Sequence, residues 1–114
     1  MKKTIFVFLA VLLSATIHAA DIANGRRLVE MNNCISCHGA DLKTPISAEY
    51  PKIAGQHKDY LLHAMLAYQA NTNNQWVGRS NPIMVGQMAK FSRQELEDIA
   101  AYIASLAGDL VIKR

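Results

Sequence analysis

The motif Cys34-Ile35-Ser36-Cys37-His38 limits the structures open to this chain more than any other part of its sequence. Two cysteines three positions apart lie one helical turn from each other, so both sulfurs can bond to the two vinyl groups of a single haem. The histidine that follows can then present its imidazole to the iron. This C-x-x-C-H pattern is typical of covalent haem attachment. We therefore predict one haem c, bound through Cys34 and Cys37, with His38 as an iron ligand.

Three other kinds of site use cysteines at this spacing: a redox-active pair, half of a zinc site, and a structural disulfide. A thioredoxin-like redox pair occurs in a βαβ context, and a structural zinc site takes four nitrogen or sulfur ligands, typically from two pairs. The chain has only two cysteines, and its sequence supplies neither context. Haem attachment is the favoured interpretation, and the other three remain as alternatives.

Residues 1–20 have the layout of a secretory signal peptide. Two early lysines precede an apolar run from Ile5 to Leu13, and small residues follow, ending in Ala19-Ala20. A helix that spans a membrane needs about 20 mostly apolar residues, and polar residues interrupt this run from His18 onward. We expect cleavage near residue 20, a mature domain of residues 21–114, a periplasmic location and no stable membrane insertion.

The charge of the chain argues against nucleic-acid binding. The formal net charge is +3 and the sequence pI is about 9.0, but two of the 12 basic residues are Lys2 and Lys3. Without them, 10 basic residues stand against 9 acidic ones, a net charge of +1. Two haem propionates would bring the total to zero or below. The basic pI therefore indicates no nucleic-acid partner.

Hydrophobic periodicity and helix-end signals predict an all-α domain with three main helices. The first is expected to begin with Asp21 as its N-cap and to run toward the cysteines. The second covers residues 58–70. The third begins with a capping box formed by Ser92 and Glu95, and it is expected to end at Gly108. Its buried stripe is expected to comprise Leu96, Ile99, Ala100, Ile103 and Leu106.

Two long connections, residues 39–56 and 71–90, join these helices. They are longer than compact domains usually leave without structure or a task. Wrapping a cofactor is such a task. A domain of this size also has a marginal core of its own, to which a buried haem would add apolar bulk.

Four motifs in this order resemble the class I c-type cytochromes, in the small bacterial form that also occurs as each half of the periplasmic dihaem cytochromes. They are Cys34–Gly39, Tyr50–Gln56, Gly78–Met84 and Ala100–Ile103. The resemblance covers essentially all of the mature chain. It implies the class I cytochrome c fold, with helices and long loops wrapped around one haem. It also implies that Gly25 and Tyr102 mark the crossing of the first and last helices, where glycine allows close approach.

The resemblance assigns roles at three further positions. Pro51 is expected to offer its carbonyl oxygen to the second ring nitrogen of His38, as metal-bound histidines commonly require; a simple loop turn is the alternative. Ile53 is expected to pack against the porphyrin. Arg79 matches an arginine near a haem propionate, a charge-assisted contact, with a solvated loop cation as an equal alternative.

Met84 is the expected sixth iron ligand. Its spacing from Arg79 and Phe91 matches the ligand methionine of similar proteins. Met88, one helical turn later, is the rival, and flexible core filling is the alternative for any methionine here. A haem with both axial positions filled exchanges electrons, whereas an open position binds or activates small molecules.

Four other residues are assigned away from the iron. Met31 and Met65 are expected in the core because of their helical spacing. His57 and His63 are ligands in principle, since histidine is the commonest metal ligand. Lone histidines of this kind are more often surface or satisfied core residues, so we expect no iron ligation by them.

The expected function is electron transport by a periplasmic single-haem carrier that cycles between Fe(III) and Fe(II). It is not an enzyme, and its redox protein partners are expected to dock transiently over a small surface. The main alternative is a cytochrome subunit of a periplasmic dehydrogenase such as a flavocytochrome. A haem sensor or peroxidase-like enzyme would require an open or displaceable sixth position.

Overall fold

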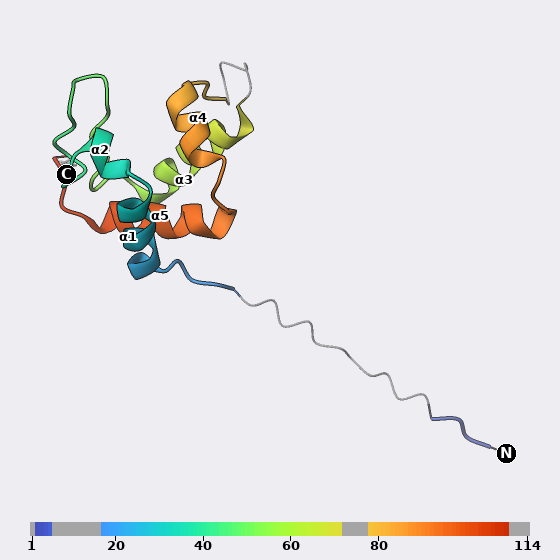
Figure 1. The fold of residues 1–114 in the computed structure, drawn as a ribbon. Helices are drawn as coiled ribbons and strands as arrows, with labels where there is room; N and C mark the ends of the chain where they lie inside the picture. Colours follow the sequence, from blue (N-terminus) through green and yellow to red (C-terminus); the bar gives the residue numbers. More distant parts are fainter. Residues whose placement is uncertain (1, 6–16, 72–77, 110–114) are drawn as a thin grey trace, which may run out of the picture.

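Five α-helices and their connecting loops make up the described part of the chain, residues 2–5, 17–71 and 78–109 of the computed structural model (Figure 1). Within these ranges there is no strand, which confirms the all-α prediction. The helices are α1 (Ile22–Met31), α2 (Cys34–His38), α3 (Lys58–Ala70), α4 (Pro82–Met88) and α5 (Arg93–Ser105). None of the helices described is long and apolar enough to cross a membrane. Residues 6–16, which include most of the apolar run of the predicted signal peptide, lie outside the described residues.

The three predicted helices are present, and the predicted N-terminal caps of the first and third are formed. The carboxylate of Asp21 accepts a hydrogen bond from the backbone N–H of Asn24 at 3.0 Å and begins α1. Ser92 Oγ accepts from the N–H of Glu95 at 3.2 Å, while the Glu95 carboxylate accepts from the N–H of Ser92 at 2.8 Å. This reciprocal capping box begins α5. The bounds of α3 are those expected, residues 58–70.

The end of α5 differs from the prediction. The helix ends at Ser105, and Leu106 follows in an extended conformation. Gly108 is not a left-handed helix cap, and it lies against the loop that contains Ala54 instead, where a Cβ at residue 108 would overlap the Ala54 carbonyl oxygen. The glycine is therefore explained by a close contact between segments distant in the sequence, which no local pattern reveals.

Two shorter helices, α2 and α4, were not among the three predicted. α2 is a single short helix formed by the haem-attachment motif itself. α4 lies in the connection predicted to be a long loop, of which residues 72–77 lie outside the described part. A signal for α4 is present in the sequence, because Asn81 caps it and Pro82 occupies its first turn, the position where proline is favoured.

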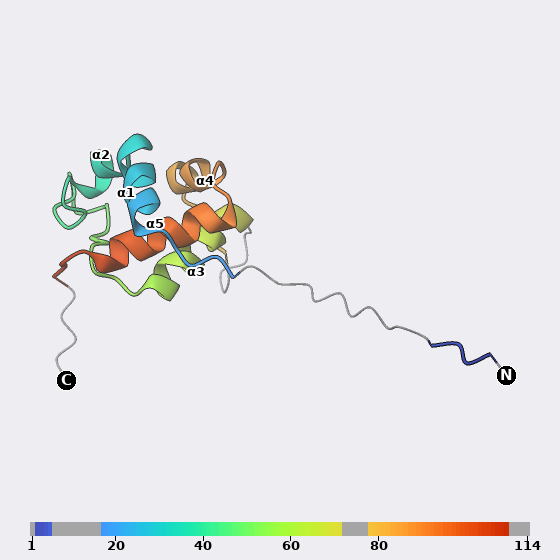
Figure 2. The same cartoon turned by 90° about the horizontal axis from the view of Figure 1, so that it is seen from below.

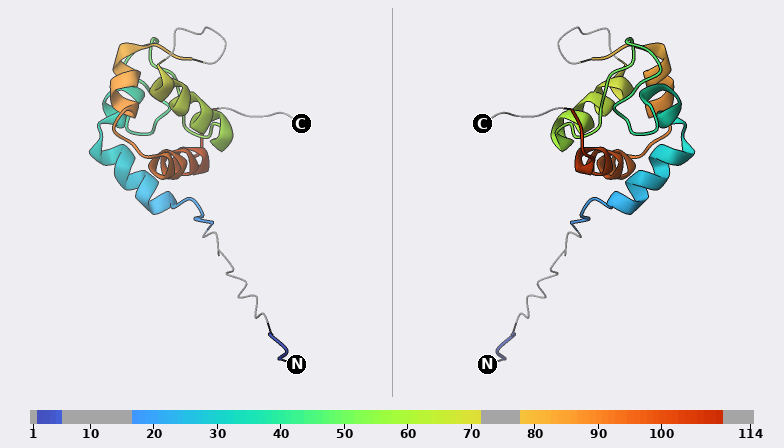
Figure 3. Two further views of the ribbon diagram at one scale, coloured as in Figure 1. Left: turned by 90° about the vertical axis from the view of Figure 1, so that its right-hand side faces the viewer. Right: turned by 90° about the vertical axis from the view of Figure 1, so that its left-hand side faces the viewer.

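α5 is the helix on which the others are assembled. α1 crosses it at Gly25, where a Cβ would overlap the carbonyl oxygen of Asp98 and come within 2.9 Å of Tyr102 Cβ. The predicted crossing of the first and last helices is therefore confirmed. α3 also packs on α5, and α4 packs on α3. Figure 2 shows α5 running across the domain, and Figure 3 shows it nearly end-on at the base, with α3 and α4 above it.

The core is built from the predicted stripe of α5 and from the facing sides of the other helices. Four of the five stripe residues are buried, and Leu106 is half-buried against the core. Met65 is buried as expected, at 6% exposed. The assignment of Met31 to the core is wrong, since 67% of this residue is exposed. It occupies the last turn of α1, where the helix already leaves the core for α2.

Asp98 is a buried charged residue, 4% exposed, that connects the start of α1 to the middle of α5. Its carboxylate accepts hydrogen bonds from the N–H of Asp21 at 2.8 Å, from Asn24 Nδ2 at 2.8 Å and from Gln94 Nε2 at 3.0 Å. Burial alone would raise the pKa of Asp98, but these donors, with help from the charge of Lys58, outweigh it and hold the pKa below its ordinary value. The buried carboxylate therefore stays ionised near neutral pH.

Candidate functional site

The two cysteines lie on the single helical turn of α2, half-buried and not joined to each other. Asn33, in the left-handed conformation with φ of 59°, turns the chain from α1 into α2. Burial raises the pKa of the Cys34 thiol, and this residue packs against the core. Among the residues described, no group of three or more His, Cys, Asp or Glu side chains is arranged to hold a metal ion.

The imidazole of His38, at the end of α2, is 7% exposed and held by one defined contact. Its Nδ1 lies 2.8 Å from the carbonyl oxygen of Pro51. A carbonyl only accepts hydrogen bonds, so Nδ1 carries the proton in this contact. In the neutral imidazole, Nε2 is then the nitrogen without a proton and the one able to ligate a metal.

The loop that carries Pro51 is anchored at Leu42. This residue is 1% exposed and adopts a left-handed conformation with φ of 57°, rare for a leucine. Its carbonyl oxygen accepts hydrogen bonds from the N–H groups of Ile53 at 2.9 Å and Ala54 at 3.0 Å. Ile53 is half-buried and packs against the core. These hydrogen bonds thus connect the two halves of the predicted loop, residues 39–56, next to His38 and Pro51.

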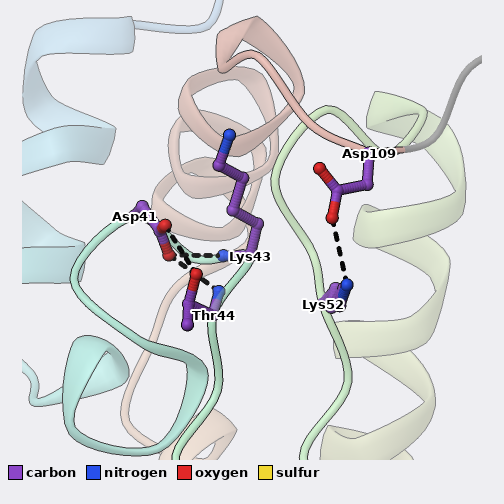
Figure 4. A network of polar contacts seen from close by, with 5 residues as sticks. All are labelled: Asp41, Lys43, Thr44, Lys52 and Asp109. Atoms are coloured by element: carbon purple, nitrogen blue, oxygen red, sulfur yellow. Dashed lines mark hydrogen bonds and ion pairs between the residues drawn. The ribbon is translucent and has the colours of Figure 1, made fainter.

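A tight turn over residues 41–44, which includes Leu42, shapes this loop (Figure 4). The Asp41 carboxylate accepts from the N–H of Lys43 at 3.0 Å, from the N–H of Thr44 at 2.8 Å and from Thr44 Oγ1 at 2.8 Å. The bonds to Lys43 and Thr44 lower the pKa of Asp41. Asp41 and Leu42 were not predicted from the sequence, although an aspartate followed by backbone donors two and three residues on is a known turn signal.

α4 presents the two candidate methionines. The Asn81 side chain accepts from the N–H groups of Ile83 and Met84, both at 3.1 Å, which places Met84 in the first turn. Met84 is half-buried and packs against the core, whereas Met88 is 4% exposed and belongs to the core itself. Gln69 of α3 donates to the Met88 carbonyl oxygen at 2.8 Å and holds this end of α4.

α2 and α4 lie on opposite sides of the domain in both Figure 1 and Figure 2. The parts of these two helices that the structure describes make no direct packing contact with each other. His38 and Met84 are therefore supplied by separate elements, one on each side. The donor set fits the haem c that the motif predicts: two thiols on one turn, an imidazole with one nitrogen engaged, and thioethers on a separate helix.

Arg79 is held on α3 and is not a freely solvated cation. Its guanidinium carbon lies 5.5 Å from the ring centroid of Tyr68 and 5.9 Å from that of Tyr60. Nη2 donates to the Tyr60 hydroxyl at 3.2 Å. Contacts with Tyr68 and Tyr60 raise the pKa of Arg79. The two tyrosines that orient this arginine were missed by the sequence analysis, because their partner lies beyond the end of α3.

The two remaining histidine candidates lie at the surface of α3. His57 and His63 are both exposed, His57 at the N-cap of α3 and His63 on its outer face. They share no metal-holding cluster among the residues that the structure describes.

Comparison with known proteins gives one family match. The family model "Cytochrome c" matches residues 22–107. The chain is similar to cytochrome c4 of Stutzerimonas stutzeri, with 34% identity over 113 residues that cover 96% of this chain and 52% of that protein. It is also similar to cytochrome c-554(547) of Halothiobacillus neapolitanus, with 29% identity over 93 residues, 77% of this chain and 99% of that protein.

A solved structure matches at the level of the fold. The crystal structure of reduced recombinant cytochrome c4 from Pseudomonas stutzeri has a TM-score of 0.68 and 36% sequence identity, covering 80% of this chain and 48% of that chain. The chain therefore spans about half the length of the cytochromes c4 that it matches.

Proposed function

Since this chain belongs to the cytochrome c family, with the class I all-α fold and a covalently bound haem c, we propose that it carries electrons through a single haem ligated by His38 and Met84. When bound, the haem iron supplies a one-electron Fe(III)/Fe(II) couple. The chain transforms no substrate of its own. Its residues attach the cofactor, fix the ligands and limit access to them.

The hydrogen bond between His38 and Pro51 is the observation that carries this proposal. A buried imidazole whose Nδ1 donates to a backbone carbonyl at 2.8 Å has its tautomer and its ring orientation set before any metal is bound. Such a partner also makes the ligating nitrogen more basic. Cys34 and Cys37, on the same short helix, are the groups that would form the two thioether bonds.

Met84 is the better candidate for the second axial ligand. Met88 already fills a place in the core at 4% exposed, and moving its side chain to a cofactor would leave a cavity there. Met84 packs against the core but remains half-exposed, so its sulfur can be supplied to a cofactor at little packing cost. The cap at Asn81 fixes the turn that bears it.

The proposed partners are redox proteins that dock transiently. One relative, the "Thiosulfate dehydrogenase electron acceptor" of Stutzerimonas stutzeri, is 29% identical over 104 residues. This likeness supports an oxidising enzyme as the class of donor, and it also keeps a permanent place in a dehydrogenase as the second candidate. Co-purification from the native source distinguishes the two, because a lone monomer contradicts the permanent subunit.

The signal peptide and the periplasmic location are part of the same proposal. Covalent haem attachment to a chain with a basic, then apolar, then small-residue leader fits export before maturation. Mass spectrometry of the protein from the native host measures both features at once. A mass that contains residues 21–114 plus one haem is expected, and retention of residues 1–20 would contradict the proposal.

The test of the iron ligands is an absorption spectrum of the oxidised holoprotein. The weak far-red band of a methionine-to-Fe(III) charge transfer is expected in the wild type and in Met88→Ala, and its loss is expected in Met84→Ala. Survival of the band in Met84→Ala would assign the ligand elsewhere. Rapid binding of carbon monoxide to the reduced wild type at neutral pH would instead favour an open-site sensor or peroxidase.

A further inference from the structure

The residues that follow α5 lie against the loop that carries Pro51. We call residues 106–109 the C-terminal strap. Gly108 approaches the backbone of Ala54 so closely that a Cβ would overlap the Ala54 carbonyl oxygen. Just before the strap, the carbonyl oxygen of Ile103 accepts from the N–H of Gly55 at 3.0 Å. These contacts join the end of the chain to residues 54 and 55.

An ion pair extends the contact to the residue next to Pro51. Lys52 Nζ lies 3.0 Å from the Asp109 carboxylate, and Figure 4 shows this pair spanning the gap between the loop and the strap. Both side chains are 56% exposed, so the pair by itself stabilises little. Its geometry nevertheless shows that the strap runs alongside the loop from residue 55 back to residue 52.

The loop has few other supports at this point. Pro51 and Lys52 are exposed, so side-chain burial does not hold them. On one side, Ile53 and Ala54 bond to the carbonyl of Leu42; on the other side, the strap covers Ala54 and Gly55. The position of the Pro51 carbonyl oxygen, 2.8 Å from His38 Nδ1, therefore depends on both contacts.

We propose that Gly108 is a positioning residue for the His38 ligand, acting through Ala54 and Pro51. A side chain at residue 108 would push Ala54 away and lengthen the bond from Nδ1 to the Pro51 carbonyl. The weakened bond makes His38 a less basic ligand, and a less basic ligand favours Fe(II) over Fe(III). The proposal rests on the proposed ligation by His38.

The first test is the reduction potential of Gly108→Ala in the haem-loaded protein. The Fe(II) to Fe(III) ratio at a fixed ambient potential is expected to rise about threefold or more, which is about +28 mV because a tenfold change in a one-electron couple is 59 mV. Gly86→Ala is the matched control, since a Cβ there meets nothing within 4 Å. A potential in Gly108→Ala equal to that of the wild type and of Gly86→Ala would overturn the proposal.

The second test uses surface variants that cannot fail through a steric clash. Exchange of the His38 Nδ1 proton with solvent, measured by NMR in the reduced holoprotein, is expected to be faster by about two- to fivefold in Lys52→Gln and in Asp109→Asn, the range open to one exposed pair. The double variant is expected to show the same exchange rate as each single variant, because all three remove the same Lys52–Asp109 ion pair. Unchanged exchange in these three variants would overturn the role of the strap.

These readouts separate this inference from the proposed function. If His38 does not ligate the haem, the visible spectrum of the wild type itself will lack a six-coordinate pattern. If His38 ligates the haem but neither the potential nor the Nδ1 exchange responds to the variants, the ligation stands and only the strap is excluded.

Discussion

The buried carboxylate of Asp98 is expected to contribute to the stability of the domain through its hydrogen bonds. It is 4% exposed and accepts three hydrogen bonds, one from the N-cap of α1, Asp21, and one from Asn24 in the first turn of that helix. Asp98→Asn keeps the shape of the side chain but places an NH2 group opposite N–H donors. Each hydrogen bond to a charged group contributes about 1.5–3 kcal/mol, and an unpaired buried partner costs about 1–3 kcal/mol.

The expected loss is smaller than the sum of these contributions. Burying the carboxylate has its own desolvation cost, and the donors are only partly buried, so water can replace part of what is lost. The amide oxygen of asparagine also retains at least one of the bonds. We expect the free energy of unfolding to fall by about 2–3 kcal/mol at pH 7, within the range for breaking a buried polar network.

The pH dependence of this loss follows from the lowered pKa of Asp98. A carboxylate whose pKa is lower in the folded than in the unfolded state stabilises the fold above the unfolded value of about 3.9. That contribution is lost as the pH falls through the folded value. The difference between the wild type and Asp98→Asn is therefore expected to be full near pH 7 and to shrink below about pH 4.

Guanidinium unfolding of both holoproteins at pH 7, 5 and 3 measures this difference. Glu97→Gln is the neighbouring control, because Glu97 forms an ion pair with Arg93 at 3.1 Å in which the arginine side chain is 66% exposed, and its loss is expected to change stability by less than about 1 kcal/mol. A loss in Asp98→Asn that is no larger than in the control, or that stays constant down to pH 3, would refute the reasoning.

Three further predictions concern the scaffold and are measured by the same unfolding experiment. Gly25→Ala is expected to cost about 2 kcal/mol or more because its Cβ overlaps the Asp98 carbonyl oxygen, whereas Gly86→Ala, with open space, is expected to gain up to about 1 kcal/mol from helix propensity; equal effects would disprove the close crossing. Ser92→Ala removes half of the capping box and is expected to cost about 1 kcal/mol, and no change would mean that the cap is not used. Leu96→Ala, at a position 0% exposed, is expected to cost about 2–5 kcal/mol, and a loss below about 1 kcal/mol would contradict its place in the core.

Much of the fold follows from signals that lie within one or two helical turns of each other. The caps at Asp21 and Ser92 were predicted and are present, because a cap needs only its own backbone donors. The short helix of Cys34, Cys37 and His38 is likewise recognised from the local spacing of these residues. α4 was missed, although its Asn81-Pro82 start is also local.

The predictions that failed or stayed incomplete concern residues whose surroundings are set by segments distant in the sequence or by the path of the helix. Gly108 is the residue type expected after a helix C-terminus, but in the structure it allows a close contact with the backbone of Ala54. Met31 has core spacing along α1, but the helix leaves the core before its last turn. Arg79 has no local partner in the sequence, and two tyrosines of α3 hold it.

Local sequence thus specifies the attachment of the haem, since Cys34, Cys37 and His38 lie on one turn and need no other element to be recognised. The surroundings of His38 depend on the folded chain, because the Pro51 carbonyl is brought to Nδ1 by Leu42 from one side and by Gly108 from the other. Those contacts join segments far apart in the chain, and their geometry exists only after α1, α3 and α5 have packed. The identity of the iron ligand is therefore specified by one short motif, while the basicity of that ligand depends on packing between distant backbone segments.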